Sequence, residues 1–383
     1  MNSSKTNILH VRDKKVPQSN FTFLFDKIPV PYCMLYKYLG LSINEYLDYQ
    51  QIAELQSEAA SRALSLIITK MIKNGGFPYN VYSTLYESCC ASVCDYGGEV
   101  IGFQQFSSSL KLHLRAARAF LGCPVNTTSP GVLSEIMWLN PVHRNKVRMI
   151  RQYNRVLKML PTRLTRVIVE WDKLVSPHIP RDTWTDEIQS IFHEHNVLTI
   201  FESGSSFTSK LFFDNLKHSM MKVQAIQLKS ECEDKPKLRT FIKFKNFLNI
   251  PAYLTKTISF LQRRAIAQLR LGQLRLRIEQ ARTVRPILPV NERTCPVCFK
   301  LKSTLCPRPD TFQVEDEIYF LFKCPAYSDL RNNWFNLMNL PYNFHTLCDY
   351  EKISLVLNTP ELIKPTANFI LQAFDMRSKI LNS

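Results

Sequence analysis

The 383-residue chain is 45% hydrophobic and 21% charged, a balance that excludes wholesale disorder and leaves room for two or three folded domains. Lys and Arg number 49 against 32 Asp and Glu, so the formal net charge is +17, which favours a polyanionic partner such as nucleic acid. The N-terminal stretch lacks the apolar core of a signal peptide, and the longest apolar run, "ALSLIITKMI", is too short to span a bilayer, so we expect an intracellular protein, nuclear or cytoplasmic, with no membrane partner.

The first forty-odd residues are predicted to form short strands. Runs of β-branched and aromatic residues occur in "TNILHVR", "FTFLFD" and "MLYKYLGLSI", and turn residues separate them. Helical spacing of apolar residues takes over after that, and glycine is scarce, with only 10 residues. We therefore expect a mainly α fold with a small N-terminal β-hairpin region.

The helices are predicted from apolar spacing of three and four residues and from the residues that begin and end helices. "NGGFP" marks the end of the first helix, and the prolines of "TTSP" and "LNP" mark the beginnings of two later ones. The predicted ranges are 45–74, 80–98, 108–122, two helices that begin near 129 and 141, then 182–194, 206–230, 237–248 and 252–281, and two or three helices between 328 and 380.

A cationic face is predicted between Arg144 and Arg166, where eight Lys or Arg residues occur without an acid. Spacings of 4, 3, 4 and 3 place five of them on one side of a helix, opposite an apolar stripe of Ile150, Tyr153, Leu157 and Leu160. Phosphate groups would neutralise this face, and pairing with the acids between 182 and 194 is the alternative. The five residues are Arg144, Arg148, Arg151, Arg155 and Lys158.

A second cationic run extends from Lys256 to Arg285 and contains eight basic residues and one acid, Glu279. Its arginines alternate with Leu and Ile, and their forked guanidinium groups suit phosphate contacts that carry little sequence preference. Pairing within the fold is the alternative for each single arginine. The predicted contacts are Arg263, Arg264, Arg270, Arg275, Arg277 and Arg282.

The cysteines that follow are predicted to bind a metal ion. Cys295 and Cys298 form a CxxC pair, which presents two thiolates to one tetrahedral ion, and Cys324 adds a third. Tyr319 occupies the position where a histidine would complete such a site. Cys306 is the tentative fourth ligand, with His345 as another source, and the expected cofactor is structural Zn²⁺. The alternative is a small module held by aromatic packing alone.

Several motifs together resemble the C-terminal half of the polymerase of a non-LTR (LINE-type) retrotransposon. "NSSKTNILHVR" is similar to the segment after the catalytic palm motif, "YKYLG" to the primer-grip hairpin, and "YGGEVIG" to the thumb motif. "RAARAFLG" and "EIMWLNPVHR" resemble the segments that follow the thumb motif. "LRLGQLRLRIEQAR" resembles the stretch before the terminal zinc knuckle, and "RTCPVC" with "EDEIYFLFKCPAY" resembles the knuckle itself.

The resemblance implies a domain order and a function. It implies a palm-end and primer-grip-like β region at 1–45, a helical thumb at 46–160, a helical connector at 161–286, a zinc-knuckle-like module at 287–340 and C-terminal helices at 341–383. Such parts hold template and primer, so RNA or an RNA–DNA duplex is the implied partner, and Lys37 in the hairpin is an implied contact. Lys5 lies in a stretch that carries a nucleotide-proximal lysine in such polymerases.

The sequence departs from that family in two ways. It contains neither an Asp-bearing motif A nor a [YF]xDD motif, so we predict no Mg²⁺ site and no catalytic residue in this chain. The usual knuckle histidine is replaced by Tyr319.

The leading hypothesis is therefore a non-catalytic nucleic-acid-binding remnant of a retrotransposon reverse transcriptase. The first alternative is part of an active RNA-directed DNA polymerase whose palm lies upstream or in trans. The second is a zinc-dependent protein-interaction module, and the third is a fragment with no selected function.

Overall fold

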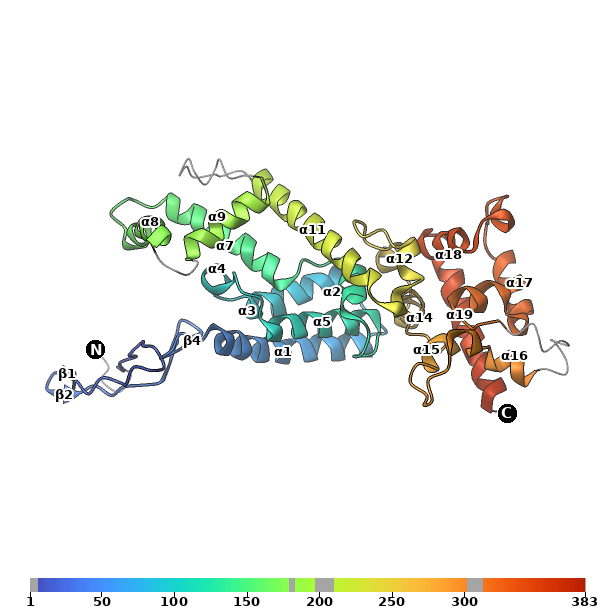
Figure 1. Ribbon diagram of the computed structural model, residues 1–383, viewed down its shortest axis with the longest axis horizontal. Helices are drawn as coiled ribbons and strands as arrows, with labels where there is room; N and C mark the ends of the chain where they lie inside the picture. Colours follow the sequence, from blue (N-terminus) through green and yellow to red (C-terminus); the bar gives the residue numbers. More distant parts are fainter. Residues whose placement is uncertain (1–5, 179–182, 197–209, 302–312, 383) are drawn as a thin grey trace. The chain divides into compact units, whose positions relative to one another are not determined.

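The computed structural model describes residues 6–178, 183–196, 210–301 and 313–382. Helices dominate this part of the chain, and its strands form two hairpins of two strands each (Figure 1). The predicted mainly α fold with a small N-terminal β region is confirmed. Within the same ranges, no helix combines the length and the apolar character needed to cross a membrane.

The chain divides into two compact units whose segments alternate along the sequence. The first unit consists of Met1–Ser65, Tyr86–His113 and Leu139–Met220. The second unit consists of Leu66–Leu85, Leu114–Trp138 and Met221–Ser383. Because the segments alternate, no single cut of the chain separates the units.

The two hairpins come first in the chain and belong to the first unit. Strands β1 (Leu24–Phe25) and β2 (Ile28–Pro29) pair in antiparallel fashion, as do β3 (Leu35–Tyr38) and β4 (Leu41–Asn44). Leu39 and Gly40 join β3 to β4 with φ values of 46° and 93°. Positive φ at both central residues is typical of a two-residue hairpin turn, because it matches the twist of the strands.

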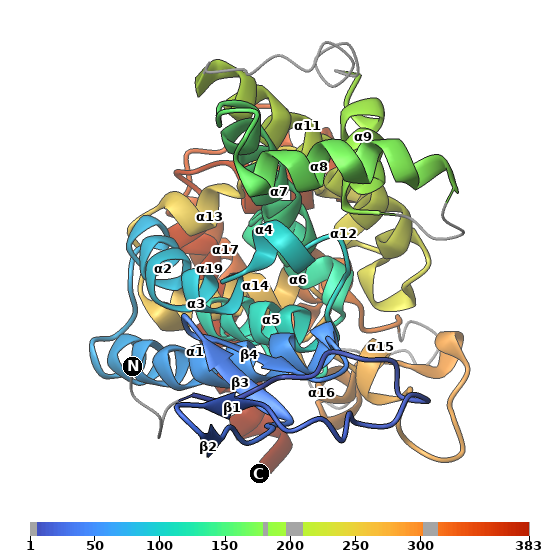
Figure 2. The ribbon, with the colours of Figure 1, turned by 90° about the vertical axis from the view of Figure 1, so that its left-hand side faces the viewer.

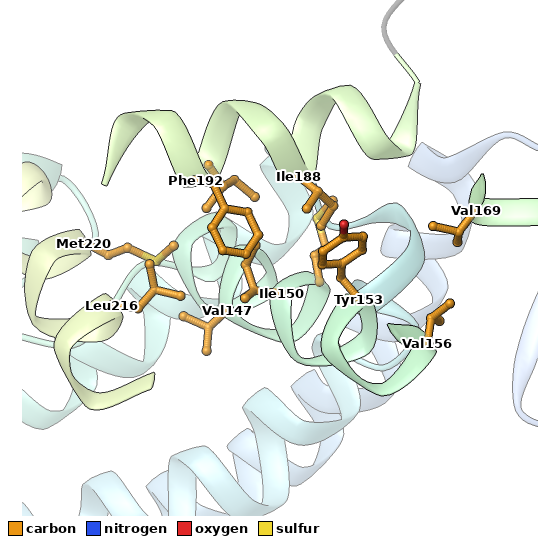
Figure 3. Packing of buried hydrophobic residues seen from close by; sticks show 11 residues of the cluster. Val147, Ile150, Tyr153, Val156, Val169, Ile188, Phe192, Leu216 and Met220 are labelled. Carbon is orange, nitrogen blue, oxygen red and sulfur yellow. The ribbon is translucent and has the colours of Figure 1, made fainter. Parts of the chain in front are cut away.

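The core of the first unit forms around α7 (Pro141–Leu157). Its residues at three-residue spacing, among them Val147, Ile150 and Tyr153, point toward α9 and α11 and pack against Phe192 and Leu216 (Figure 3). The apolar stripe predicted on this helix is buried at Ile150 and Tyr153 and half-buried at Leu157. The prediction is wrong for Leu160, which lies beyond the end of α7 and is 71% exposed. The helices of this unit are α1 (Tyr49–Lys73), α3 (Ser92–Cys94), α4 (Gly98–Ile101), α5 (Ser107–Leu121), α7, α8 (Leu164–Val175), α9 (Trp184–Glu194) and α11 (Lys210–Glu233), of which α1, α5 and α11 continue into the second unit.

Helix α8 was not predicted from the sequence. It packs against α7 and α9 (Figure 2), yet Val169 is its only buried residue. Asp172 joins it to the start of α9 by accepting hydrogen bonds from the backbone N–H of Thr185 at 3.1 Å and from its hydroxyl at 2.8 Å. Leu164 and Trp171 remain exposed. Helix α8 thus differs from α7, because its apolar face is left mostly in water.

The second unit has an aromatic core of its own. The rings of Trp334 and Phe369 stack with centroids 4.4 Å apart, and Phe320 and Phe344 are fully buried beside them. Its elements are α2 (Tyr79–Tyr86), α6 (Ser129–Ile136), α12 (Phe241–Phe244), α13 (Ala252–Thr255), α14 (Phe260–Arg270), α15 (Arg277–Gln280), α16 (Pro296–Lys300), α17 (Ser328–Asn336), α18 (Asp349–Asn358), α19 (Ile363–Asn382) and the π-helical turn η7 (Tyr319–Lys323).

The predicted helix 252–281 is wrong, because three short helices occupy that range. Ser259 and Gln262 form a capping box that starts α14 afresh. Gly272 ends it with φ of 60°, and a Cβ there would lie 2.5 Å from the carbonyl oxygen of Lys237, so only glycine allows the close approach. The predicted helix 237–248 is also wrong beyond the short α12.

Candidate metal centre and cationic surfaces

The three cysteines predicted as metal ligands lie together in the second unit. Cys295 is the residue before α16, and Pro296 begins that helix with a backbone angle already suited to it, so the first turn brings Cys298 back beside Cys295. Cys324 comes directly after η7. The exposed fractions of the three residues are only 1% to 2%.

The distances between the three sulfur atoms are compatible with binding to one shared ion. All three Sγ atoms lie within 4.8 Å of one another, and Sγ of Cys324 is 3.4 Å from that of Cys298 and 4.0 Å from that of Cys295. Two thiolates at about 2.3 Å from one tetrahedral zinc ion would be roughly 3.8 Å apart. The buried group of Cys295, Cys298 and Cys324 could therefore hold a metal ion.

The fourth position of this group is occupied by a phenol. The hydroxyl of Tyr319 lies 3.3 Å from Sγ of Cys298, so the side chain that replaces the expected histidine points at the cluster. Among the described residues, no histidine nitrogen or carboxylate oxygen lies within 4.8 Å of all three sulfur atoms. His345 is exposed and contacts the rings of Phe335 and Phe344 instead. Cys306, the tentative fourth ligand, lies outside the described residues.

A buried carboxylate supports the centre from one side. Glu315 is fully buried and accepts a hydrogen bond from Sγ of Cys295 at 3.3 Å. The Nη2 group of Arg377 donates to its Oε2 at 2.9 Å, and the backbone N–H of Arg277 donates to the same oxygen at 2.7 Å. The negative charge of Glu315 is thus balanced by Arg377, so the cysteine sulfur atoms are the groups left to bind a metal ion.

The thiols interact strongly with one another. Hydrogen bonds from the Cys295 and Cys324 thiols hold the pKa of Cys298 far below its ordinary value. The same contact with Cys298, together with burial, raises the pKa of Cys295. A bound cation would stabilise all three groups as thiolates.

The first half of the predicted cationic face on α7 is bonded inside the first unit. Arg144 donates to both carboxylate oxygens of Asp95, from Nε at 2.7 Å and from Nη2 at 3.1 Å. Arg148 donates from Nη1 to the backbone carbonyl of Asp95 at 3.2 Å. Their guanidinium groups hold the "DYGG" loop, so neither is free to bind phosphate with all its donors.

The second half of that face is open. Arg151, Arg155 and Lys158 are exposed, and in the described part of the chain none of them has a carboxylate partner. The Arg151 guanidinium lies 5.2 Å from the ring centroid of Phe213, which orients it at the surface by a cation–π contact. We refer to Arg151, Arg155 and Lys158 as the α7 cationic end.

The second predicted run separates into buried and exposed arginines. Arg263 and Arg270 are 3% and 2% exposed, and both bond to groups inside the second unit. Arg282 is half-buried, and its Nε lies 3.1 Å from Oε2 of Glu279. Arg277 is also half-buried. Burial therefore removes Arg263 and Arg270 from an open phosphate-contacting surface.

Arg264 and Arg275 remain exposed and share a groove. The groove has a volume of about 390 Å³ and is also lined by Gln268, Gln273 and Phe374, all from the second unit. Two guanidinium groups, two amides and an aromatic ring are suitable contacts for phosphates and bases. Lys37, the other predicted contact, is exposed on β3 opposite Ser42.

The structure also reveals a buried charge cluster that the sequence did not predict. Glu135 is fully buried, and its carboxylate accepts from Nε and Nη2 of Arg270 at 2.9 and 3.0 Å and from the Tyr253 hydroxyl at 2.5 Å. Nζ of Lys245 lies 3.8 Å away. One signal was present in the sequence, because Glu135 is the only acid in "SPGVLSEI", a helix whose other positions are mostly apolar or small.

No protein-family model, curated protein or solved structure matches the chain. Its function therefore has to follow from its own side chains: three buried thiols, a cationic helix end and a groove with two free arginines.

Proposed function

We propose that this chain binds nucleic acid, RNA or an RNA–DNA duplex, as a non-catalytic part of a reverse-transcriptase-like protein. The observation that carries this proposal is the α7 cationic end, where three exposed cations stand without a carboxylate partner in the described residues. Like charges three and four residues apart repel each other by a few tenths of a kcal/mol per pair, about 0.2–0.5. A phosphate backbone would relieve that repulsion, and the net charge of +17 acts in the same direction.

The packing of α7 supports this proposal. Its inner side is anchored by Ile150, Tyr153 and the rest of the buried cluster, so the outer cations project from a rigid helix and do not require a loop to become ordered. A pre-ordered set of cations loses less conformational entropy on binding. Contacts from such residues reach phosphates and not base edges, so the binding should show little sequence preference.

Fluorescence anisotropy with a labelled RNA–DNA duplex tests the proposal. The double variant Arg155→Gln/Lys158→Gln should flatten the slope of log K against log salt by roughly 1.5 to 2, because two phosphate contacts are lost. The matched control is Lys146→Gln, on the same helix, whose Nζ is already 3.1 Å from Glu194 and whose loss should change the slope little. Absence of binding by the unmodified protein at about 50 mM salt would refute the proposal.

We further propose that the three cysteines hold a zinc ion. Thiolate sulfur favours zinc over hard cations such as Mg²⁺, and buried sites of this kind are structural. Metal content of the purified chain, measured by mass spectrometry, tests this assignment. Cys298→Ser should abolish bound zinc, whereas Cys348→Ser, at an exposed cysteine outside the cluster, should keep it. Equal zinc content in both variants would refute the assignment.

A further inference from the structure

A cavity in the second unit lies apart from both the metal centre and the groove of Arg264 and Arg275. It has a volume of about 400 Å³, within the range of small-ligand sites. Its walls come from the turn between α1 and α2, residues 75–80, from the segment 254–258 after α13, and from Arg263 of α14. All these segments belong to the second unit. No carboxylate is among the described residues that line the cavity.

Arg263 brings a buried, uncompensated positive charge to this cavity. Its Nε donates to the carbonyl oxygen of Phe120 and its Nη1 to that of Phe77, each at 2.9 Å, while the guanidinium lies 3.9 Å from the ring centroid of Phe120. The third nitrogen, Nη2, is buried without a hydrogen-bond partner among the described residues. It lies beside Gly76 on the cavity wall, since a Cβ built on Gly76 would be 3.5 Å from it.

Arg270 on the same helix has a carboxylate partner, which Arg263 lacks among the described residues. Arg270 is equally buried, and Glu135 neutralises it through two hydrogen bonds. Arg263 has only two neutral carbonyl groups and no carboxylate partner in the described ranges. A buried cation without a counter-charge is costly, and burial lowers the pKa of Arg263 to about 10. An anion in the cavity would remove that cost.

Two further groups at the cavity favour an anion. The N–H of Tyr82 bonds to the carbonyl of Pro78, so α2 begins there. The helix dipole adds partial positive charge at this end. Lys256 lines the cavity as well; its side chain is 45% exposed, and its Nζ lies 3.8 Å from Oε1 of Glu361, whose side chain is 72% exposed.

We propose that this cavity is a binding site for a phosphate group, with Arg263 Nη2 as the buried contact, the N-terminal end of α2 as a source of partial positive charge, and Lys256 as a cation at the entrance. The phosphate could belong to a small molecule such as a nucleoside monophosphate or to the end of an oligonucleotide. The chemistry of recognition is the same in both cases, because it concerns the phosphate itself. The site does not depend on the α7 cationic end.

Isothermal titration calorimetry on the full chain tests the site with three probes: inorganic phosphate, adenosine monophosphate, and a short oligonucleotide with either a 5′-phosphate or a 5′-hydroxyl. Inorganic phosphate should bind, whereas chloride at equal ionic strength should not. Tighter binding of the nucleoside monophosphate would identify a small-molecule ligand. A preference for the 5′-phosphate over the 5′-hydroxyl oligonucleotide would identify a nucleic-acid end.

Two variants locate the binding. Lys256→Gln, at an exposed position that should not affect folding, should weaken phosphate binding by about tenfold, and Arg263→Met should abolish it. Lys146→Gln, at a lysine of the first unit that is already paired with Glu194, is the matched control and should bind phosphate as the unmodified chain does. If inorganic phosphate does not bind, or if Lys256→Gln and folded Arg263→Met both bind it unchanged, the site is refuted. Loss of duplex binding in Arg155→Gln/Lys158→Gln with phosphate binding intact would separate this site from the proposed nucleic-acid surface.

Discussion

Replacing Arg270 with methionine should destabilise the second unit without removing a nucleic-acid contact. Arg270 and Glu135 are 2% and 0% exposed and share two hydrogen bonds of 2.9 and 3.0 Å. Removing one partner of a buried pair leaves the other charge uncompensated, which costs about 3 to 5 kcal/mol. Lys245, 3.8 Å from Glu135, still offers a positive charge, so we expect a loss near the lower end.

Thermal and urea unfolding, followed by circular dichroism, measure that loss. For a unit of this size it corresponds to a fall in Tm of roughly 6 to 20 °C. The matched control is Arg264→Met on the same helix, whose exposed side chain should change stability by less than about 0.5 kcal/mol. The two variants should rank in the reverse order in duplex binding. Arg264→Met should weaken the salt dependence of binding, and Arg270→Met should leave it unchanged.

The pH dependence of the free energy of unfolding is a second test of the same cluster. Burial alone would raise the pKa of Glu135, but the charges of Arg270 and Lys245 outweigh it and the pKa lies below its ordinary value. The stability that Glu135 contributes is therefore present above its unfolded-state pKa of about 4.3 and is lost as the pH falls through its folded pKa. In Arg270→Met the loss should begin at higher pH. Unchanged stability together with weaker duplex binding in that variant would refute the buried pairing.

Other predictions concern the metal centre and the core of the first unit. Tyr319→His should place an imidazole beside Cys298 and tighten zinc binding by about tenfold or more in chelator competition, and Tyr319→Phe should give no gain. Burial, followed by the charge of Arg144, lowers the pKa of His113 well below its usual value, so stability should fall as the pH drops below about 6.5, the unfolded value. Urea unfolding at pH 7 and 5.5 should show a loss of about 1 kcal/mol that His113→Gln reduces; an equal loss in the variant would refute this role.

The sequence by itself determined where most helices lie and which cysteines belong together. Helical spacing, the glycines after α1 and the prolines that begin α6 and α7 act through neighbours within one or two turns, so local pattern is enough to find them. The CxxC pair and Cys324 were likewise predicted as one group, and the structure confirms that their sulfur atoms meet. The position of Tyr319 was also readable, although only the fold shows its hydroxyl pointing at Cys298.

Tertiary structure alone decided which arginines face solvent. Arg263, Arg264 and Arg270 have no distinguishing signal in the sequence of α14. Arg264 lines an open groove, whereas Arg270 bonds to Glu135, a residue 135 positions earlier in the chain. Arg263 donates hydrogen bonds to two backbone carbonyl groups and has no carboxylate partner among the described residues. A charged side chain becomes buried only where a partner is supplied from a distant segment, because its desolvation must be offset there. Periodicity reports which side of a helix a residue occupies; only the long-range fold reports what lies opposite.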